Sequence, residues 1–224
     1  MGSRYCVVIP AFNANGRIGE LVRRVRRHGF EVIVIDDGSR DGTASIASRE
    51  GALVISHLRN EGKGRALRTA FEYALRSRYD GVVTMDSDGQ HDPDEIPKLV
   101  RAGERQHAGI VVGNRLTDGS LMPLARHWTN ALMSSVVSAV ARQRIPDSQC
   151  GFRFIRAEVL ADVPLRSRHF EIESELLFGA AARRWKIVSV PVRSIYQGER
   201  SHIRPVRDGM RFIRTLLRHL MGRG

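Results

Sequence analysis

Residues 81–91 read Gly-Val-Val-Thr-Met-Asp-Ser-Asp-Gly-Gln-His, an apolar run that stops at two carboxylates. The apolar half is typical of a buried β-strand. Asp86, Asp88 and the amide of Gln90 then supply oxygen ligands of the kind that Mg²⁺ or Mn²⁺ prefers, and a cation held in this way usually also binds phosphate oxygens. An acidic turn before the helix that Pro93 opens is an alternative interpretation of about equal weight.

Strand-like and helix-like segments alternate on both sides of this stretch. The strands are predicted at 5–9, 31–35, 53–55, 81–85 and 110–112. The helices between them are predicted at 18–25, 41–50, 66–75 and from Pro93 onward. This order is typical of an α/β fold with a mostly parallel sheet flanked by helices, and such a sheet binds its ligands at the carboxyl ends of the strands.

The pattern is looser after residue 115. Helices are predicted at 124–141 and 173–183, and strands at 152–155 and 187–192. The last segment, 205–221, is predicted to be a helix with apolar residues every three or four positions and arginines among them. A basic amphipathic helix of this kind can lie in a membrane interface, and the alternative is that it packs on the body of the protein with its arginines in solvent.

Charge is unevenly distributed along the 224 residues. The chain contains 36 Lys and Arg against 24 Asp and Glu, a net charge of +12, which by itself favours a nucleic acid or an anionic membrane as partner. Residues 1–30 contain six arginines and one glutamate, and residues 200–224 contain seven arginines and one aspartate. The excess of positive charge lies at the two ends, aromatic residues make up only 6% of the chain, and no nucleic-acid motif is recognisable. We therefore expect no nucleic-acid partner, and a basic nucleic-acid-binding module is a disfavoured alternative.

Other global features favour a cytoplasmic location. Cys6 and Cys150 are too few for a disulfide framework or a zinc site, which fits a reducing compartment. No apolar run approaches the roughly 20 residues needed to span a bilayer, and the start of the chain shows no signal peptide.

Two further polar segments follow predicted strands. Residues 36–43 read Asp-Asp-Gly-Ser-Arg-Asp-Gly-Thr, and a carboxylate at the end of a strand is well placed to bond a base or a ribose. Asp37 is therefore predicted to bind ligand, and 41–43 to cap the next helix. Residues 60–64 read Asn-Glu-Gly-Lys-Gly and suit an anion through backbone N–H groups and Lys63, although a solvated loop lysine is the simpler alternative.

These segments occur together with Pro-Ala-Phe-Asn at 10–13, in order and at strand ends. As a set they resemble the family-two glycosyltransferases of the Rossmann-like GT-A fold, most closely the dolichol-phosphate or polyprenyl-phosphate mannosyltransferase-like branch. The resemblance covers residues 5–203. It continues downstream in the segments 113–115, 147–153, 173–176 and 190–192.

The resemblance implies a hexosyltransferase that moves a sugar, with inversion and with a divalent metal, from a GDP- or UDP-sugar. Donor contacts are then expected from Pro10, Ala11, Phe12, Asp37, Lys63, Asp86, Ser87, Asp88 and Arg200. Mg²⁺ or Mn²⁺ is expected at Asp86, Asp88 and Gln90. Catalytic roles near the phosphates and the acceptor are expected for Arg115, Arg126 and Asp147. Glu173 and Glu175 are expected either to position the donor sugar or, as an equally good alternative, to form buried pairs with arginine.

The chain also departs from the family pattern. Phe12 and Ala14 stand where the family often has Tyr and Glu, so the identity of the donor does not carry over. The family's late Gly-x-Ser-Lys is matched only loosely at 198–202, where Arg200 would supply the missing lysine charge. The Gln-x-x-Arg-Trp motif of processive polysaccharide synthases is absent, which argues against polymerisation.

The acceptor decides which chemistry the enzyme needs. A lipid phosphate is already ionised and needs no strong base, whereas a sugar hydroxyl needs one, for which Asp147 is the first candidate. The favoured acceptor is a polyprenyl phosphate, with the tail at 205–221 holding the enzyme peripherally on the cytoplasmic face of the membrane. A soluble glycosyltransferase acting on a hydroxyl acceptor is the main alternative. A sugar nucleotidylyltransferase is disfavoured because an early Gly-rich loop is missing.

The resemblance also predicts how the chain is divided. A GT-A domain is expected over 1–203, with a nucleotide-sugar half at 1–115 and an acceptor half at 116–203. A basic amphipathic tail helix is expected at 204–224.

Overall fold

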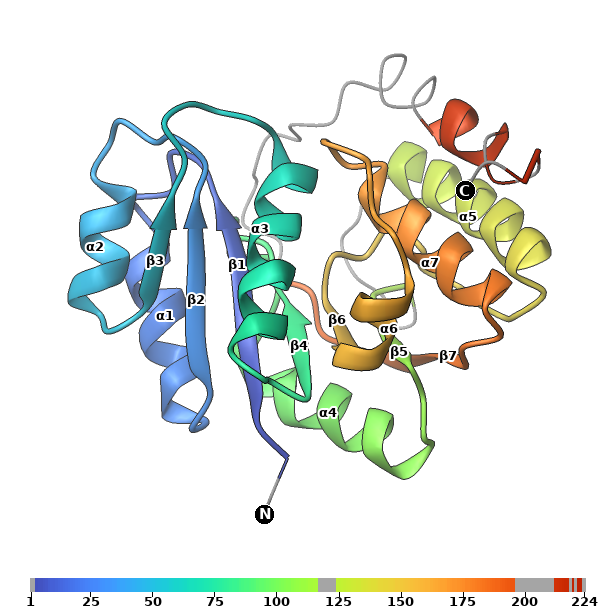
Figure 1. The fold of residues 1–224 in the computed structure, drawn as a ribbon, viewed down its shortest axis with the longest axis horizontal. Helices are drawn as coiled ribbons and strands as arrows, with labels where there is room; N and C mark the ends of the chain where they lie inside the picture. The colour runs from blue at the N-terminus through green and yellow to red at the C-terminus, as the bar shows by residue number, and fades with distance from the viewer. Residues whose placement is uncertain (1–2, 117–123, 196–211, 218, 220, 223–224) are drawn as a thin grey trace.

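A seven-stranded sheet in the order β3-β2-β1-β4-β6-β5-β7 forms the centre of the protein (Figure 1). The computed structural model describes residues 3–116, 124–195, 212–217, 219 and 221–222, with the side chains of 124–127 excepted. The strands are β1 (Tyr5–Ala11), β2 (Glu31–Asp36), β3 (Leu53–Ser56), β4 (Gly81–Thr84), β5 (Ile110–Asn114), β6 (Arg153–Arg156) and β7 (Ile187–Pro191). Neighbouring strands are parallel except that β6 runs antiparallel to both β4 and β5. The predicted α/β fold with a mostly parallel sheet is confirmed.

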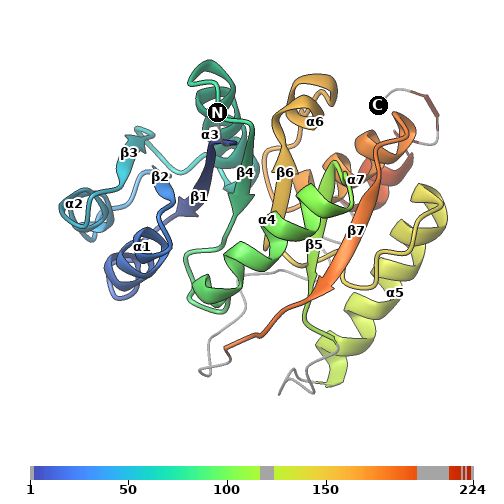
Figure 2. The same cartoon turned by 90° about the horizontal axis from the view of Figure 1, so that it is seen from below.

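Helices cover both faces of the sheet (Figure 2). On one face lie α3 (Lys63–Arg76) and α6 (Ala157–Asp162), and on the other lie α1 (Ile18–Arg27) and α4 (Ile96–Arg105). A short 3-10 turn, η1 (Pro93–Glu95), leads into α4. At the β3 end of the sheet α2 (Thr43–Arg49) packs beside α1, and at the β7 end α5 (Leu124–Ala141) packs against α7 (Ile172–Ala182).

The double cover explains why the inner strands are apolar almost throughout. Cys6 to Ile9 in β1 and Val32 to Ile35 in β2 are at most 3% exposed. A parallel sheet with helices on both faces buries both sides of its strands, which gives continuous apolar runs instead of alternation. The same burial raises the pKa of the Cys6 and Cys150 thiols to about 12, so neither is a thiolate nucleophile near neutral pH.

One helix starts clearly earlier than predicted, and one helix was not predicted. The first turn of α3 starts at Lys63, three residues before the predicted start, because the preceding loop is fixed by backbone hydrogen bonds to Asp37. The sequence did not indicate α6, which has only six residues and follows β6 directly, since so short a helix shows no clear periodicity.

The arginine cluster of α1 is held in ion pairs. Arg23 pairs with Glu50 at 2.8 Å, and Arg24 pairs with Asp92 at 2.6 Å. This helix lies at the opposite end of the sheet from the tail helix (Figure 1). Two of the six arginines of the first 30 residues are therefore paired with acidic groups at the end of α2 and in the segment before α4.

The tail forms a helix over 212–217, and residues 205–211, 218 and 220 of the predicted helix lie outside the described residues. Phe212 is 8% exposed and lies 6.3 Å from the ring of Phe178 in α7, whereas Ile213 and Leu217 are about half exposed. The tail thus packs on the body with one side and presents large apolar side chains on the other. No helix in the described part of the chain combines the length and the apolar character needed to cross a membrane.

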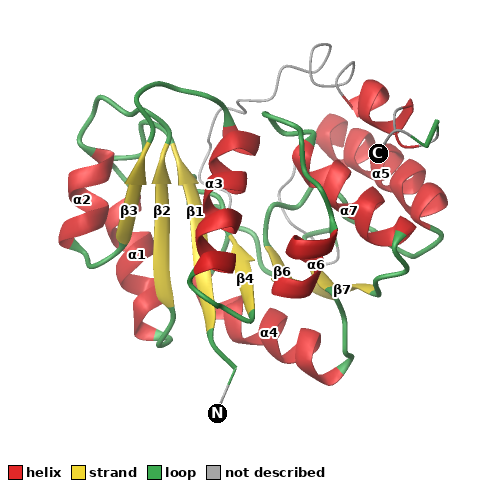
Figure 3. Ribbon diagram, viewed as in Figure 1, coloured by secondary structure: helices red, strands yellow, loops and turns green. Residues whose placement is uncertain are grey.

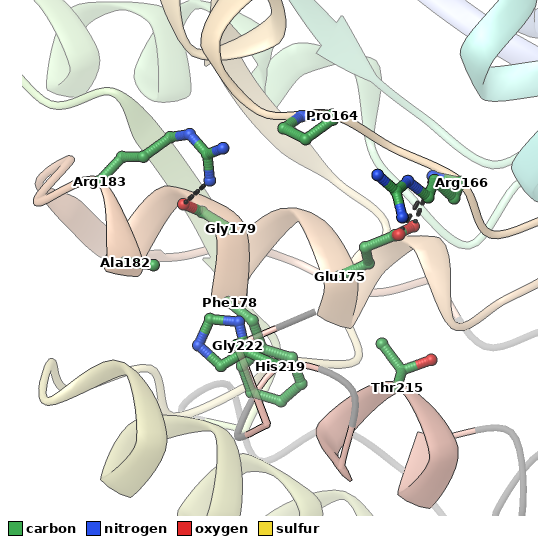
Figure 4. A pocket seen from close by; sticks show the side chains of 10 residues that line it. All are labelled: Pro164, Arg166, Glu175, Phe178, Gly179, Ala182, Arg183, Thr215, His219 and Gly222. Atoms are coloured by element: carbon green, nitrogen blue, oxygen red, sulfur yellow. Dashed lines mark hydrogen bonds between the residues drawn. The ribbon is translucent and has the colours of Figure 1, made fainter. Parts of the chain in front are cut away.

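A small cavity of about 170 Å³ lies between α7 and the tail (Figure 4). On the tail side, the imidazole of His219 stacks on Phe178 with the ring centres 5.3 Å apart. Charged side chains of Arg166, Glu175 and Arg183 also line the cavity. Burial lowers the pKa of His219 below its ordinary value, and the positive charge of Arg183 lowers it further.

Docking of the tail is expected to weaken in mild acid. Because the pKa of His219 is lowered in the docked state, docking favours the neutral imidazole. The contribution of His219 to the free energy of docking is complete above the ordinary pKa of a free histidine, near 6.5. Below that pH the contribution decreases, because the undocked imidazole takes up a proton before the docked one does. Amide protection factors of 212–217, corrected for intrinsic exchange, should fall between pH 7.5 and 5.5. In His219→Phe, which keeps a ring on Phe178, they should not change, and identical pH dependence in both proteins would contradict the role of His219.

Candidate functional site

Several predicted site residues meet at the carboxyl edge of β1, β2 and β4. These strands are parallel neighbours, so they end at the same edge of the sheet (Figure 3). The backbone N–H of Met85 donates to Val8 at 3.1 Å, and that of Asp37 donates to Ala11 at 2.8 Å. The loop from Asp86 to Gln90 therefore lies beside the end of β1, where Pro10 and Ala11 are followed by the half-exposed ring of Phe12.

Asp37 supports the loop before α3. Its carboxylate accepts backbone hydrogen bonds from Glu61 at 3.0 Å and from Gly62 at 2.8 Å, and it contacts the Nδ1 atom of His57 at 2.7 Å. The side chain is almost fully buried. It thus lies at the predicted strand end, but the chain itself occupies both carboxylate oxygens. His57 was not predicted, because a single loop histidine gives no signal of its partner twenty positions away.

Asp41 closes the turn into α2, as predicted. It accepts hydrogen bonds from the backbone N–H and the hydroxyl of Thr43, at 3.1 and 2.6 Å, and from the backbone N–H of Asn15 at 3.1 Å. Asp41 therefore ties the end of the β1 loop to the start of α2, and its role is structural.

Lys63 lies between two carboxylates from distant parts of the chain. Its Nζ atom is 2.6 Å from Oδ1 of Asp86, which follows β4, and 2.7 Å from Oε1 of Glu173 in the first turn of α7. The side chain of Lys63 is 14% exposed, that of Asp86 is 27% exposed and that of Glu173 is 11% exposed. The ring of Phe170 lies 5.5 Å from the ammonium. A lysine predicted to meet a donor anion is thus paired inside the protein.

The opposite charges of this cluster outweigh the effect of burial. Desolvation opposes the charge of Lys63, but Asp86 and Glu173 raise its pKa well above that of an ordinary lysine. Desolvation also opposes ionisation of Asp86, but Lys63 and His91 bring the pKa of this carboxyl well below its usual range. The ammonium and the carboxylate of Asp86 are therefore charged at neutral pH.

His91 and the later segment 148–153 pack around Asp86. The Nε2 atom of His91 lies 3.5 Å from Oδ2 of Asp86, and the imidazole stacks on Phe152 with the ring centres 5.1 Å apart. Arg153, which is 1% exposed, donates to the backbone carbonyls of Ser148, Cys150 and Glu173 at 2.7 to 2.8 Å. These contacts fix the segment 148–153 against the carboxylate. The family resemblance included the segment 147–153, but the sequence did not predict how His91 and Arg153 pack.

Arg115 and Asp147, both predicted to be catalytic, form a buried ion pair. The guanidinium contacts both carboxylate oxygens, at 2.8 and 3.0 Å, and the backbone N–H of Arg115 donates to the same carboxylate at 3.1 Å. Asp147 has no exposed surface. An oxygen that is enclosed and already bonded to a guanidinium is poorly placed to take a proton from an acceptor hydroxyl.

Glu175 is bound to the backbone near the start of α7. Its carboxylate accepts hydrogen bonds from the backbone N–H groups of Arg166 and Ser167, at 2.9 to 3.1 Å. Within the described residues, the hydrogen-bond partners of Glu175 are thus backbone N–H groups, not an arginine side chain. Glu173 does lie near a buried arginine, with Arg153 at 3.9 Å, in addition to its closer contact with Lys63.

The remaining predicted residues are described only in part. Asp88 accepts a hydrogen bond from the backbone N–H of Gln90 at 2.9 Å, and its carbonyl accepts one from Arg17 at 2.6 Å. Ser87 lies in the same half-buried loop. The side chain of Arg126 and all of Arg200, with the segment 198–202, lie outside the described residues.

The residues of the predicted metal site, Asp86, Asp88 and Gln90, would bind a cation through oxygen atoms. Within the described ranges, no group of three or more His, Cys, Asp or Glu side chains is arranged to hold a metal ion. The predicted set has two carboxylates and one amide, so the other positions around a cation would be filled from outside this set. Oxygen donors of this kind suit Mg²⁺ or Mn²⁺ and leave room for phosphate oxygens.

Known proteins are similar to this chain in sequence and in fold. The family model described as Glycosyl transferase family 2 matches residues 6–163. The UDP-N-acetylglucosamine–dolichyl-phosphate N-acetylglucosaminyltransferase of Methanococcus voltae is 29% identical over 85% of this chain and 85% of its own length. The undecaprenyl-phosphate 4-deoxy-4-formamido-L-arabinose transferase of Pseudomonas paraeruginosa is 33% identical over 69% of this chain and 47% of its own length.

A solved structure agrees with the fold. Glucosyl-3-phosphoglycerate synthase from Mycobacterium tuberculosis, in complex with Mn²⁺, UDP and phosphoglyceric acid, superposes with a TM-score of 0.74. The match covers 99% of this chain and 78% of that chain at 22% sequence identity, which supports a common fold.

Replacement of Gly151 by alanine tests how tightly this site is packed. A methyl group there would lie 2.6 Å from Oδ2 of Asp86 and 3.0 Å from Oε1 of Glu173, so both carboxylates would have to move. We expect Gly151→Ala to lower the free energy of unfolding by about 1–3 kcal/mol, measured by urea denaturation. Gly16→Ala is the control, because its methyl group would meet nothing within 4 Å. Equal stability of the two variants would contradict the close packing.

Proposed function

The chain belongs to glycosyl transferase family 2, and on this premise we propose that it transfers a sugar from a nucleotide-sugar to a lipid phosphate with a divalent metal at Asp86 and Asp88. Membership of the family makes the protein a glycosyltransferase of the GT-A fold. The observation that supports the donor site most directly is the position of the 86–90 loop at the carboxyl edge of β4, beside Phe12 and the loop that Asp37 supports.

A divalent cation fits the chemistry of this edge. The carboxylate of Asp86 already attracts one cation, the ammonium of Lys63, and its pKa is lowered accordingly. Asp86, Asp88 and Gln90 would hold Mg²⁺ or Mn²⁺ together with diphosphate oxygens of the donor. When bound, the ion would neutralise the charge that develops on the departing nucleoside diphosphate. A related fold is known in complex with Mn²⁺ and UDP, which supports a donor of the same class.

The enclosed state of Asp147 favours a lipid phosphate over a hydroxyl acceptor. A phosphate oxygen is ionised at neutral pH and can attack the anomeric carbon, with inversion, without a base. The hydroxyl alternative requires Asp147 to take a proton, and Arg115 occupies both of its oxygens. Two relatives bear names that include dolichyl phosphate and undecaprenyl phosphate, which supports the same acceptor class. Arg126 and Arg200 are proposed to contact phosphates on the basis of the sequence pattern.

The tail is proposed to hold the enzyme on the cytoplasmic face of a membrane. Ile213, Leu217 and Met221 are each about half exposed or more, and Arg214 lies exposed among them. The segment 200–224 has a strong excess of arginines, which an anionic lipid surface would attract. Amphipathic segments of this composition bind in the headgroup region through both effects together.

Replacement of Asp88 tests the metal and donor site. Asp88→Ala removes one of the two carboxylates, and we expect release of UDP or GDP from the nucleotide-sugar, in the presence of Mn²⁺ and polyprenyl phosphate, to fall by at least about a hundredfold. Glu20→Gln, which changes an exposed carboxylate on α1, is the control. Normal turnover by Asp88→Ala would rule out the proposed site.

A charged tail variant tests the membrane contact. The double variant Ile213→Asp/Leu217→Asp removes two exposed apolar side chains, each worth about 1.5–3 kcal/mol when buried. Binding to anionic vesicles in a sedimentation assay is expected to fall at least about tenfold. Leu58→Asp changes the fully exposed Leu58 in the loop after β3 and should bind like the unmodified protein. If the double variant sediments as well as this control, the tail is not the membrane contact.

A further inference from the structure

Lys63 occupies a position that the proposed reaction does not yet explain. We propose that its ammonium is a tethered counter-cation, which neutralises Asp86 and Glu173 in the donor-free enzyme and gives up Asp86 when a divalent metal arrives with the nucleoside diphosphate. This inference rests on the proposed function, because it assumes that Asp86 is a metal ligand.

The geometry makes the two cations competitors for one carboxylate. The ammonium of Lys63 is 2.6 Å from Oδ1 of Asp86, and the other oxygen faces His91 at 3.5 Å. A metal ion bonded to Asp86 would thus come close to a positive charge that is itself mostly buried. Repulsion between like charges is strong where little water lies between them. Binding of the metal therefore requires Lys63 to move away from Asp86.

Glu173 gives Lys63 a place to remain. Its Oε1 atom is 2.7 Å from the ammonium, so the lysine would still be paired with Glu173 after it leaves Asp86. Glu173 is itself fixed, because Arg153 donates to its backbone carbonyl at 2.7 Å and Gly151 lies against its carboxylate. The lysine, in contrast, has a flexible four-carbon stem. Of Lys63, Asp86 and Glu173, the lysine therefore has the side chain that can move most easily.

The nucleoside diphosphate supplies the reason for the shift. A metal without nucleotide would have to compete with the ammonium of Lys63 for Asp86, and it would gain only its contacts with the 86–90 loop. A metal that arrives with a diphosphate also brings negative charge, to which the freed ammonium can turn. Metal and nucleotide are therefore expected to strengthen each other's binding, and part of that coupling passes through the charge of Lys63.

Binding of Mn²⁺ to variants of Lys63 tests this without any measurement of turnover. The free Mn²⁺ signal in electron paramagnetic resonance is titrated with protein, alone and with UDP or GDP. The unmodified protein should bind Mn²⁺ weakly alone and much more tightly with one of the nucleotides. Lys63→Met should bind Mn²⁺ alone at least about tenfold more tightly than the unmodified protein, and the nucleotide should strengthen its binding by a smaller factor.

Matched variants separate charge from packing. Lys63→Gln is neutral but can still donate to Asp86, and it should behave like Lys63→Met even if the methionine disturbs folding. Lys63→Arg keeps the charge and should bind Mn²⁺ alone as weakly as the unmodified protein. Lys98→Met removes a lysine of α4 that pairs with Glu95, and it should not change Mn²⁺ binding.

Two results would overturn the inference in different ways. If the unmodified protein binds Mn²⁺ with a nucleotide but the neutral variants bind Mn²⁺ alone no more tightly than it does, Lys63 is not a counter-cation and the proposed function stands. If the unmodified protein binds no Mn²⁺ even with UDP and GDP, the metal site fails, and the proposed function and the role of Lys63 fail with it.

Discussion

The ammonium of Lys63, placed between Asp86 and Glu173, connects the two halves of the molecule at the candidate site. Asp86 lies in the loop after the parallel strand β4, and Glu173 lies in α7, well after the antiparallel strand β6. A mostly buried charge is tolerated only where opposite charges are held close to it. The loop after β4, the first turn of α3 and the first turn of α7 must therefore be positioned together, and the other contacts of the site follow from that requirement.

The reversed direction of β6 makes this meeting possible. Parallel strands end at one edge of the sheet, so an antiparallel neighbour begins at that edge. Residues 148–152 lead into β6 and consequently lie beside the end of β4, where a side chain at Gly151 would collide with Asp86 and Phe152 stacks on His91. Arg153, at the start of β6, then holds the backbone of Glu173. One reversed strand thus brings the later half of the chain to the edge where the earlier half presents its carboxylates.

The sequence predicted the sheet well and the internal partners of the site poorly. Apolar runs of strand length and the acidic residues after them revealed β1, β2 and β4, since burial on both faces leaves a continuous pattern. The same reasoning placed Asp37, Lys63 and Asp86 near strand ends or in loops, and the family resemblance added Asp147. Neither could show that Asp37, Lys63 and Asp147 are paired with His57, Glu173 and Arg115. Such partners lie 20 to 110 positions apart and follow no period. Pairing across that distance is a property of the folded chain.

Net charge has different meanings at the two ends of this protein. Two arginines of α1, Arg23 and Arg24, form ion pairs with Glu50, Asp92 and Asp94 toward the β3 end of the sheet. The last 25 residues contain seven arginines and a single aspartate, and in the described part of the tail Ile213 and Leu217 are about half exposed. Arginine therefore contributes ion pairs to the fold at one end, whereas at the other end the described residues show exposed Arg214 beside exposed Ile213 and Leu217. A net charge of +12 identifies a partner only when the charges already balanced inside the fold are set aside.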